Sequence, residues 1–305
     1  MSSYRIKPKQ VNEFVVKPIR LAGGGPRPSP VPHLFKINYP NIGIIAQKQT
    51  GKTTVISNII REITRANKAA GVPTVVIFFV DTLFTDPTYK EIVKRLHRAK
   101  IPYILERSLK DADGNDQLLE LMDYLKACNP EDDEWARLIG DEGEREGDSE
   151  ESFSETEIDS EPEVSVGSPV PFDTNDWDII IVIDDLSQEI RNSSTIPVLV
   201  KANRHTHATV ILSSQDVIDF PLQCLSQMQY MLAFSKIPQD PKNNRLARLY
   251  SSLSLNIPYD IFRALYEEAT SSDRPGAKSR NFLFIDQDRG KFRKNFNIGY
   301  SIREQ

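Results

Sequence analysis

Nine residues near the start of the chain have the side-chain types that hold a phosphate chain. After an apolar stretch at 41–45, the sequence continues as Ala46-Gln47-Lys48-Gln49-Thr50-Gly51-Lys52-Thr53-Thr54, and an amphipathic stretch follows to about residue 68. A phosphate-binding loop needs converging backbone N–H groups, a glycine that lets the loop close, a lysine for the β- and γ-phosphates and a hydroxyl for Mg²⁺. We therefore predict that residues 46–54 bind a nucleotide, with Lys52 on phosphate and Thr53 on Mg²⁺.

This loop differs from the usual GxxxxGK[ST] pattern at one position, where Ala46 replaces the first glycine. Alanine can adopt most of the backbone conformations required, so the change weakens the match without removing it. The alternative is a chance Gly-Lys-Thr at the start of a helix. The apolar strand before the loop and the helix pattern after it argue against that alternative.

Two further strand ends have polar side chains that suit nucleotide hydrolysis. An apolar run at 178–183 ends in Asp184 and Asp185, and a second run at 208–212 ends in Ser213-Ser214-Gln215. A carboxylate beside a phosphate loop can support Mg²⁺, which we assign to Asp184, and a second can orient the attacking water, which we assign to Asp185. Gln215 is then predicted to sense the γ-phosphate. Each feature alone also fits an ordinary core strand or surface residue; their order along the chain favours the site.

The elements that must position these residues alternate between strands and helices. The hydrophobic pattern predicts strands at 41–46, 74–80, 101–105, 178–183, 208–213 and 229–234. It predicts helices at about 52–68, 87–99, 115–127, 194–203, 241–253 and 259–269. A β-hairpin with Gly290 in its turn is expected from 282–286 and 291–296. This alternation predicts an α/β fold whose mostly parallel central sheet is flanked by helices.

Charge divides the 305 residues into three parts. The segment 131–163 holds 16 acidic residues and two arginines, a net charge of −14, whereas the rest of the chain carries 36 basic and 27 acidic residues. We predict a flexible basic Pro/Gly-rich arm at 1–32, an ATPase-type domain formed by 33–128 and 177–305, and a disordered acidic insertion at 129–176. The insertion is expected to be a linker, with competition for the basic surface or binding of a basic partner as alternatives.

The expected location is intracellular. Cys128 and Cys224 cannot form a disulfide framework, and neither lies in a motif for nucleophilic catalysis. No apolar run approaches the ~20 residues of a membrane-spanning helix, so no membrane partner is expected. The first ten residues lack the apolar stretch of a secretory signal.

The order of these motifs resembles the virion DNA-packaging ATPases of the FtsK-HerA superfamily, which poxviruses, other large nucleocytoplasmic DNA viruses, virophages and Polinton-type elements encode. The resemblance covers about 34–128 and 177–300 and includes the segment Asn203-Arg204-His205 and the closing hairpin. It implies a RecA-like P-loop NTPase of the additional-strand type that uses ATP and Mg²⁺. It also implies a homo-oligomeric ring that moves double-stranded DNA into a capsid, in the host cytoplasm, the nucleus or in association with the virion.

Carried over by position, Lys52 and Thr53 bind phosphate and Mg²⁺, Asp184 supports the metal, and Gln215 is the sensor. Asp185 replaces the more usual catalytic Glu, which shortens its reach to water by one methylene. Such rings usually complete a neighbour's site with an arginine, for which the candidates are Arg204, Arg245 and Arg248; Lys48 could instead act within its own subunit. A capsid or portal protein is a further expected partner.

DNA contact should depend on charge, since no base-recognition motif is present. The basic residues near the closing hairpin are the candidates: Arg280, Arg289, Lys291, Arg293, Lys294 and Arg303. Phosphate contacts of this kind are independent of DNA sequence. The alternative is an ordinary amphipathic hairpin with its apolar residues inward and its basic residues in solvent. His205 and His207 are expected to be surface or packing residues because no cysteine lies nearby to complete a metal site.

Three other functions remain open from the sequence. A DNA pump or helicase of the same superfamily would share these motifs without packaging DNA. A small-molecule kinase would share the phosphate loop but would need a lid with paired arginines, and no such segment is evident. A nucleotide-dependent switch with little turnover is compatible with the departures at Ala46 and Asp185.

Overall fold

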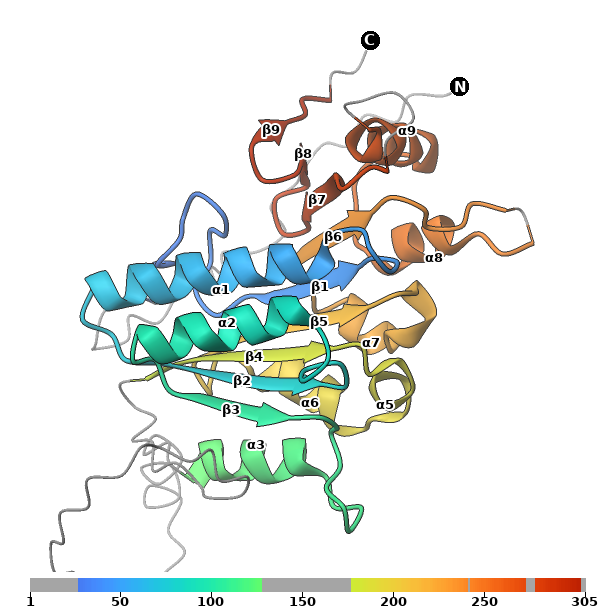
Figure 1. Ribbon diagram of the computed structural model, residues 1–305. Helices are drawn as coiled ribbons and strands as arrows, with labels where there is room; N and C mark the ends of the chain where they lie inside the picture. The colour runs from blue at the N-terminus through green and yellow to red at the C-terminus, as the bar shows by residue number, and fades with distance from the viewer. Residues whose placement is uncertain (1–26, 128–176, 241, 273–277, 303–305) are drawn as a thin grey trace, which may run out of the picture.

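A single twisted sheet organises the chain in the computed structural model, which describes residues 27–127, 177–240, 242–272 and 278–302. Most of the expected arm and all of the acidic insertion lie outside these ranges. Within them the strand order is β3-β2-β4-β5-β1-β6-β7-β8-β9 (Figure 1). The strands are β1 (Asn41–Ile45), β2 (Thr74–Val80), β3 (Tyr103–Glu106), β4 (Asp178–Asp184), β5 (Ala208–Ser214), β6 (Tyr230–Phe234), β7 (Phe282–Asp286), β8 (Lys291–Lys294) and β9 (Ile298–Gly299).

The six strands from β3 to β6 in this order are parallel, and β7, β8 and β9 continue the sheet in antiparallel pairing. Every residue of β1, β2, β4, β5 and β6 is buried. Continuous Val and Ile runs suit this position because helices cover both faces of the sheet. The predicted α/β fold with a mostly parallel sheet is therefore confirmed.

The helices divide between the two faces of the sheet. Their bounds are α1 (Lys52–Ala69), α2 (Pro87–Arg98), α3 (Gln117–Ala127), α5 (Ser187–Asn192), α6 (Thr195–Ala202), α7 (Leu222–Leu225), α8 (Arg245–Ser252) and α9 (Tyr259–Thr270), with a 3₁₀ turn η1 (Val217–Asp219). Apolar residues of α1 and α2 form one core layer with the sheet. Those of α3, α6, α8 and α9 join the layer on the opposite face. None of the described helices is long and apolar enough to span a membrane.

Strand β5 lies between β1, which precedes the phosphate loop, and β4, which ends in the two acids. Its register places Ser213 opposite Ile44 on one side and Asp184 on the other. An extra strand between these two is the additional-strand arrangement predicted above. Because the three strands are parallel, their carboxyl ends meet at the same edge of the sheet.

Each strand and helix predicted from the sequence is present, and the differences are at the ends and in short elements. The helix expected at 241–253 begins only at Arg245, because the Asn244 side chain accepts a 2.8 Å hydrogen bond from the amide of Ala247 and caps it. The sequence analysis missed α5, η1, α7 and β9. These elements have two to six residues, too few for a periodic pattern.

Residues 27–32, which the sequence analysis assigned to the arm, contact the rest of the domain in the structure. Val31 is 2% exposed and belongs to the same core layer as Phe35. Arg27 Nη1 lies 3.0 Å from Asp178 Oδ1 at the start of β4. Prolines prevent helix and strand in this segment, but they do not prevent its apolar side chain from packing in the core.

Candidate nucleotide-binding site

The loop between β1 and α1 has the backbone of a phosphate-binding loop. Gly51, immediately before the helix, has a φ of 95°, a left-handed conformation that glycine adopts without steric cost. Gln49 also has a positive φ of 65°. The Thr50 hydroxyl donates a 2.7 Å hydrogen bond to the carbonyl of Gln47, which closes the loop internally. The loop therefore lies at the amino end of an 18-residue helix, where backbone N–H groups and the helix dipole favour an anion.

Four of the predicted residues meet at this edge of the sheet. Lys52 Nζ lies 2.7 Å from Asp184 Oδ1 and 2.6 Å from Asp185 Oδ1. Gln215 Nε2 donates a 3.2 Å hydrogen bond to Asp185 Oδ1. Lys52 and Asp185 thus connect the phosphate loop with the ends of β4 and β5.

Burial separates the two acids. The Asp184 side chain is 0% exposed, whereas the Asp185 side chain is 22% exposed. Asp185 also has a positive φ of 59°, which turns the chain sharply after β4. Of the two acids, only Asp185 can therefore contact a water molecule without a structural change. This agrees with its predicted role of orienting the attacking water.

The ion pairs and the burial shift the pKa values in this cluster. Burial raises the pKa of Asp184 above its usual value of 3.8; the charge of Lys52 opposes this shift and that of Asp185 adds to it. For Lys52, burial alone would lower the pKa, but the two carboxylates raise it above 10.5 overall. Lys52 therefore stays protonated and can neutralise phosphate oxygens.

Tyr89 is a site residue that the sequence analysis missed. Its hydroxyl donates a 2.6 Å hydrogen bond to Asp184 Oδ2, and its side chain is 0% exposed. Burial and then the Asp184 charge raise the pKa of Tyr89 well above 10, so its proton remains on the phenol. The ring packs edge-on against Phe78 of β2, at 6.0 Å between centroids. Tyr89 therefore fixes the orientation of the buried carboxylate.

Asp86, at the start of the same helix, is a second missed residue. One oxygen of its carboxylate accepts a 2.7 Å hydrogen bond from the amide of Thr88 and caps α2. The other lies 3.4 Å from the hydroxyl of Thr53. The amino end of α2 thus contacts both residues predicted to support Mg²⁺, Thr53 through Asp86 and Asp184 through Tyr89.

The donors present fit Mg²⁺. Hydroxyl and carboxylate oxygens are the ligands this ion prefers, and it usually takes few from the protein and the rest from phosphate and water. The buried hydroxyl of Ser213, opposite Asp184 in the register, has no hydrogen-bond partner among the residues that the structure describes and is free to bind such a water. Within the described ranges no group of three or more His, Cys, Asp or Glu side chains is placed to hold a metal alone. Thr53 and Asp184 would therefore share the ion with a nucleotide.

Basic residues before β7 also contact the loop. Lys278 Nζ donates a 3.2 Å hydrogen bond to Gln49 Oε1. A Cβ atom built on Gly51 would lie 4.0 Å from the Cβ of Arg280. The sequence analysis placed Arg280 among the DNA-contacting residues, whereas the fold brings its backbone to the phosphate loop because β7 pairs with β6 beside β1.

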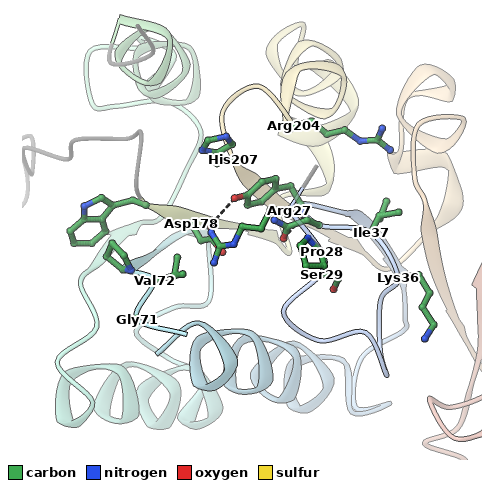
Figure 2. A pocket seen from close by; sticks show the side chains of 14 residues that line it. Arg27, Pro28, Ser29, Lys36, Ile37, Gly71, Val72, Asp178, Arg204 and His207 are labelled. Atoms are coloured by element: carbon green, nitrogen blue, oxygen red, sulfur yellow. Dashed lines mark hydrogen bonds and ion pairs between the residues drawn. The ribbon is translucent and has the colours of Figure 1, made fainter. Parts of the chain in front are cut away.

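Arg204 is not part of the cluster around Lys52. It lies in the turn before β5, at the opposite end of the sheet from Gln215, and lines a pocket of about 900 Å³ (Figure 2). His207 lies in the same pocket and stacks on Tyr39 with 5.0 Å between ring centroids. At about 3.3 Å per residue, β5 separates Arg204 from the loop by roughly 20 Å. The prediction that Arg204 acts on a neighbouring subunit remains a prediction.

The other arginine candidates, Arg245 and Arg248, lie on α8, which packs against η1 after β5. Arg245 Nε is 3.2 Å from Asp216 Oδ1, next to Gln215 in the chain. In the hairpin, Phe282, Phe284 and Phe292 are buried while Arg289 and Lys291 are exposed. The guanidinium of Arg293 lies 5.1 Å from the centre of the Phe284 ring. This is the amphipathic hairpin of the alternative interpretation, and its exposed charges remain available to a polyanion.

The chain matches no protein-family model and no curated protein sequence. Its structure is similar to that of the genome packaging NTPase B204 from Sulfolobus turreted icosahedral virus 2 in complex with AMPPCP, with 14% identity, coverage of 87% of this chain and 98% of that chain, and a TM-score of 0.47. B204, the DNA-packaging ATPase from Sulfolobus turreted icosahedral virus, gives 17% identity, 87% and 99% coverage, and a TM-score of 0.46.

EssC (ATPases 2 and 3) from Geobacillus thermodenitrificans is similar over 83% of this chain and 39% of its own, with 12% identity and a TM-score of 0.43. The two B204 structures are, by name, packaging enzymes. At this level of similarity the function must be argued from the residues of the site.

Proposed function

We propose that this chain is an ATPase that moves double-stranded DNA, and that it packages viral DNA into a capsid. The observation that carries the proposal is the junction of Lys52, Asp184, Asp185 and Gln215, where the ends of β4 and β5 meet the phosphate loop after β1. These residues contact one another although they lie far apart in the sequence. Their types are those that phosphoryl transfer to water requires.

The residues divide the work of hydrolysis. Lys52 exchanges its contacts with the two acids for oxygens of the β- and γ-phosphates and neutralises their charge. Thr53 and Asp184 would hold Mg²⁺, and the ion would supply further neutralisation of phosphate charge. Asp184 keeps its orientation because Tyr89 and Asp86 anchor the surrounding helix ends.

Asp185 and Gln215 act on the attacking water. Asp185 accepts a hydrogen bond from the water, whose oxygen attacks the γ-phosphorus as the bond to the β-phosphate oxygen breaks. The proton leaves toward Asp185 or a phosphate oxygen. Gln215 donates to Asp185, and its position changes when that carboxylate changes partner. Since Gln215 continues directly into η1 and α7, this movement can be transmitted to the rest of the subunit.

The partners in this proposal, DNA, further subunits and a capsid or portal protein, are inferred from the proposed motor function and not from an observed contact. Double-stranded DNA would be bound through phosphates, without sequence preference, by exposed basic residues. A ring of identical subunits, a capsid or portal protein, and a location in the infected cell or the virion complete the proposal. A DNA pump or helicase would share the same site, and only dependence on a capsid distinguishes packaging from them.

The test is steady-state ATP hydrolysis by the full chain with and without linear double-stranded DNA, beside Lys52→Ala. We expect DNA to raise turnover and the variant to lose hydrolysis. Hydrolysis that ignores DNA across a range of salt concentrations would refute translocation and leave an ATPase with another substrate. Absence of hydrolysis with intact ATP binding would instead favour a nucleotide switch.

A further inference from the structure

The outer surface of α1 and α2 is strongly basic and takes no part in the nucleotide site. Over residues 61–68 and 90–100, eight exposed basic side chains stand against two acidic ones. The basic residues are Arg61, Arg65, Lys68, Lys90, Lys94, Arg95, Arg98 and Lys100. The acids, Glu62 and Glu91, pair with Arg61 and Arg95 at 3.1 Å. Exposed pairs of this kind are weak, so most of the positive charge is available to a partner.

A groove of about 240 Å³ runs between the two helices on this surface. Its base is apolar, formed by the buried side chains of Ile60, Ile92 and Leu96. Its rim is basic and includes Arg61, Arg65, Lys68 and Arg95. The phosphates of a DNA backbone would pair with the basic rim, but they would gain nothing from the apolar floor of the groove. The groove therefore fits a peptide that combines acidic with large apolar side chains.

The chain itself contains such a peptide. Residues 131–139 read Glu-Asp-Asp-Glu-Trp-Ala-Arg-Leu-Ile, with four acids followed by Trp135, Leu138 and Ile139. This is where the strongly acidic part of the chain begins, and Trp135 is one of only two tryptophans in the protein. Its charge and its apolar residues are the complement of the groove.

The described residues that flank the segment containing this peptide lie at the end of the sheet where the groove also ends. The carboxyl ends of α1, α2 and α3 and the start of β4 lie at the same end of the sheet, at the left in Figure 1, with α3 on the face opposite α1 and α2. The groove includes Lys68 and Ala99 at those ends of α1 and α2. The amide of Asp178 donates a 2.9 Å hydrogen bond to the carbonyl of Pro73, in the turn after α1. Eight residues beyond Ala127, Trp135 can lie up to about 26 Å from the end of α3.

We propose that residues 131–139 dock in cis into the groove between α1 and α2, with Trp135 on the apolar base and the acids against Arg61, Arg65 and Lys68. Docking would neutralise the basic face of the two helices whose amino ends hold Thr53, Asp86 and Tyr89. The proposal concerns this surface alone and does not depend on the ATPase function.

Tryptophan fluorescence of the full chain tests it directly. Trp177→Phe leaves Trp135 as the only tryptophan. In that background we expect emission at shorter wavelength than for tryptophan in water and reduced quenching by acrylamide. Adding Arg61→Glu and Arg65→Glu should shift the emission to longer wavelength and restore quenching, as should high salt. Glutamate is a good helix former, so α1 should remain folded, which circular dichroism checks.

Arg289→Glu with Lys291→Glu is the matched control, since it reverses two exposed charges outside the groove and should leave Trp135 unchanged. Solvent-like emission in the parent and in all variants would overturn the proposal. If, in addition, only the Arg61/Arg65 reversal weakened DNA binding, the groove surface would be a DNA contact instead. An emission shift that depended on protein concentration would assign the peptide to a neighbouring copy and overturn docking in cis.

Discussion

The hydroxyl of Tyr89 donates a 2.6 Å hydrogen bond to Oδ2 of Asp184, and both side chains are completely buried. The other oxygen of this carboxylate pairs with Lys52. Asp184 is thus held by a helix on one side and by the phosphate loop on the other. The carboxylate of Asp184 therefore already has a fixed orientation before a metal ion binds. Such a site is preorganised.

Replacing Tyr89 by Phe should therefore impair Mg²⁺-dependent hydrolysis more than ATP binding. Loss of the donor leaves a buried carboxylate oxygen unsatisfied, at a cost of about 1–3 kcal/mol, or roughly 5- to 150-fold in kcat. A titration of ATP hydrolysis with Mg²⁺ measures the effect, which should appear as a higher Mg²⁺ requirement. Tyr250→Phe is the control, because Tyr250 donates its 2.7 Å hydrogen bond to the carbonyl of Ile257, away from the loop. Equal effects of the two variants would show that Tyr89 is only structural.

Stability should depend on pH through Asp184. Its pKa in the folded chain lies above the 3.8 expected when unfolded, because burial outweighs the pairing with Lys52. Between these two values the folded state binds a proton that the unfolded state has lost. The contribution of Asp184 to stability is therefore complete below pH 3.8 and is lost as the pH rises through its folded pKa.

Denaturant unfolding of the protein and of Asp184→Asn between pH 4 and 7 measures this contribution. The free energy of unfolding of the parent, relative to the variant, should fall as the pH rises, since asparagine does not titrate. A difference that stayed constant, or that rose with pH, would mean that Lys52 compensates fully for the buried charge.

Asp185 and Gln215 should affect turnover rather than binding. Asparagine tolerates the left-handed backbone at position 185, so Asp185→Asn should fold normally and lose at least about 100-fold in kcat if this residue acts on the water. Gln215→Ala removes the donor to Asp185 and should have a smaller effect of the same kind. Comparing kcat with the dissociation constant of ATP separates the two steps. A change in ATP affinity alone would assign both residues to nucleotide binding.

Arg204 offers a test of assembly. Because it lies at the opposite end of β5 from the phosphate loop, Arg204→Ala should bind ATP as tightly as the parent. If this arginine completes a neighbour's site, hydrolysis should fall, and mixing the variant with Lys52→Ala should restore part of it in mixed rings. Unchanged hydrolysis would leave Arg245 and Arg248 as the remaining candidates.

The sequence was sufficient to predict the sheet and the residues at the ends of β4 and β5, because buried parallel strands are continuous apolar runs and polar residues at their ends are conspicuous. It could not predict Tyr89 and Asp86. These lie on the helix after β2, and their proximity to Asp184 and Thr53 depends on β2 pairing with β4, a contact between strands about 100 residues apart. A tyrosine in an amphipathic helix has the pattern of any core residue. The contact of Lys278 with the loop likewise depends on β7 joining the sheet beside β6.

The structure explains why Ala46 can replace the first glycine of the usual phosphate-loop pattern. Substitutions at Ala46 and at Gly51 test this explanation. Ala46 is 2% exposed, its amide donates a 3.0 Å hydrogen bond to the carbonyl of Ser214, and its φ is negative. A methyl group is therefore accommodated without strain, and Ala46→Gly should retain hydrolysis while losing about 0.5–1 kcal/mol of stability through the more flexible unfolded chain.

Gly51→Ala, unlike Ala46→Gly, should impair the nucleotide site. At a φ of 95° a side chain is strained even though the nearest atom to an added Cβ is 4.0 Å away, so the loop rather than its neighbours would have to change. We expect loss of ATP binding, measured by calorimetry, with a folded core. If Gly51→Ala bound ATP normally while Ala46→Gly did not, the phosphates would depend on the start of the loop rather than on the helix amino end, and the placement of Lys52 at the γ-phosphate would be wrong.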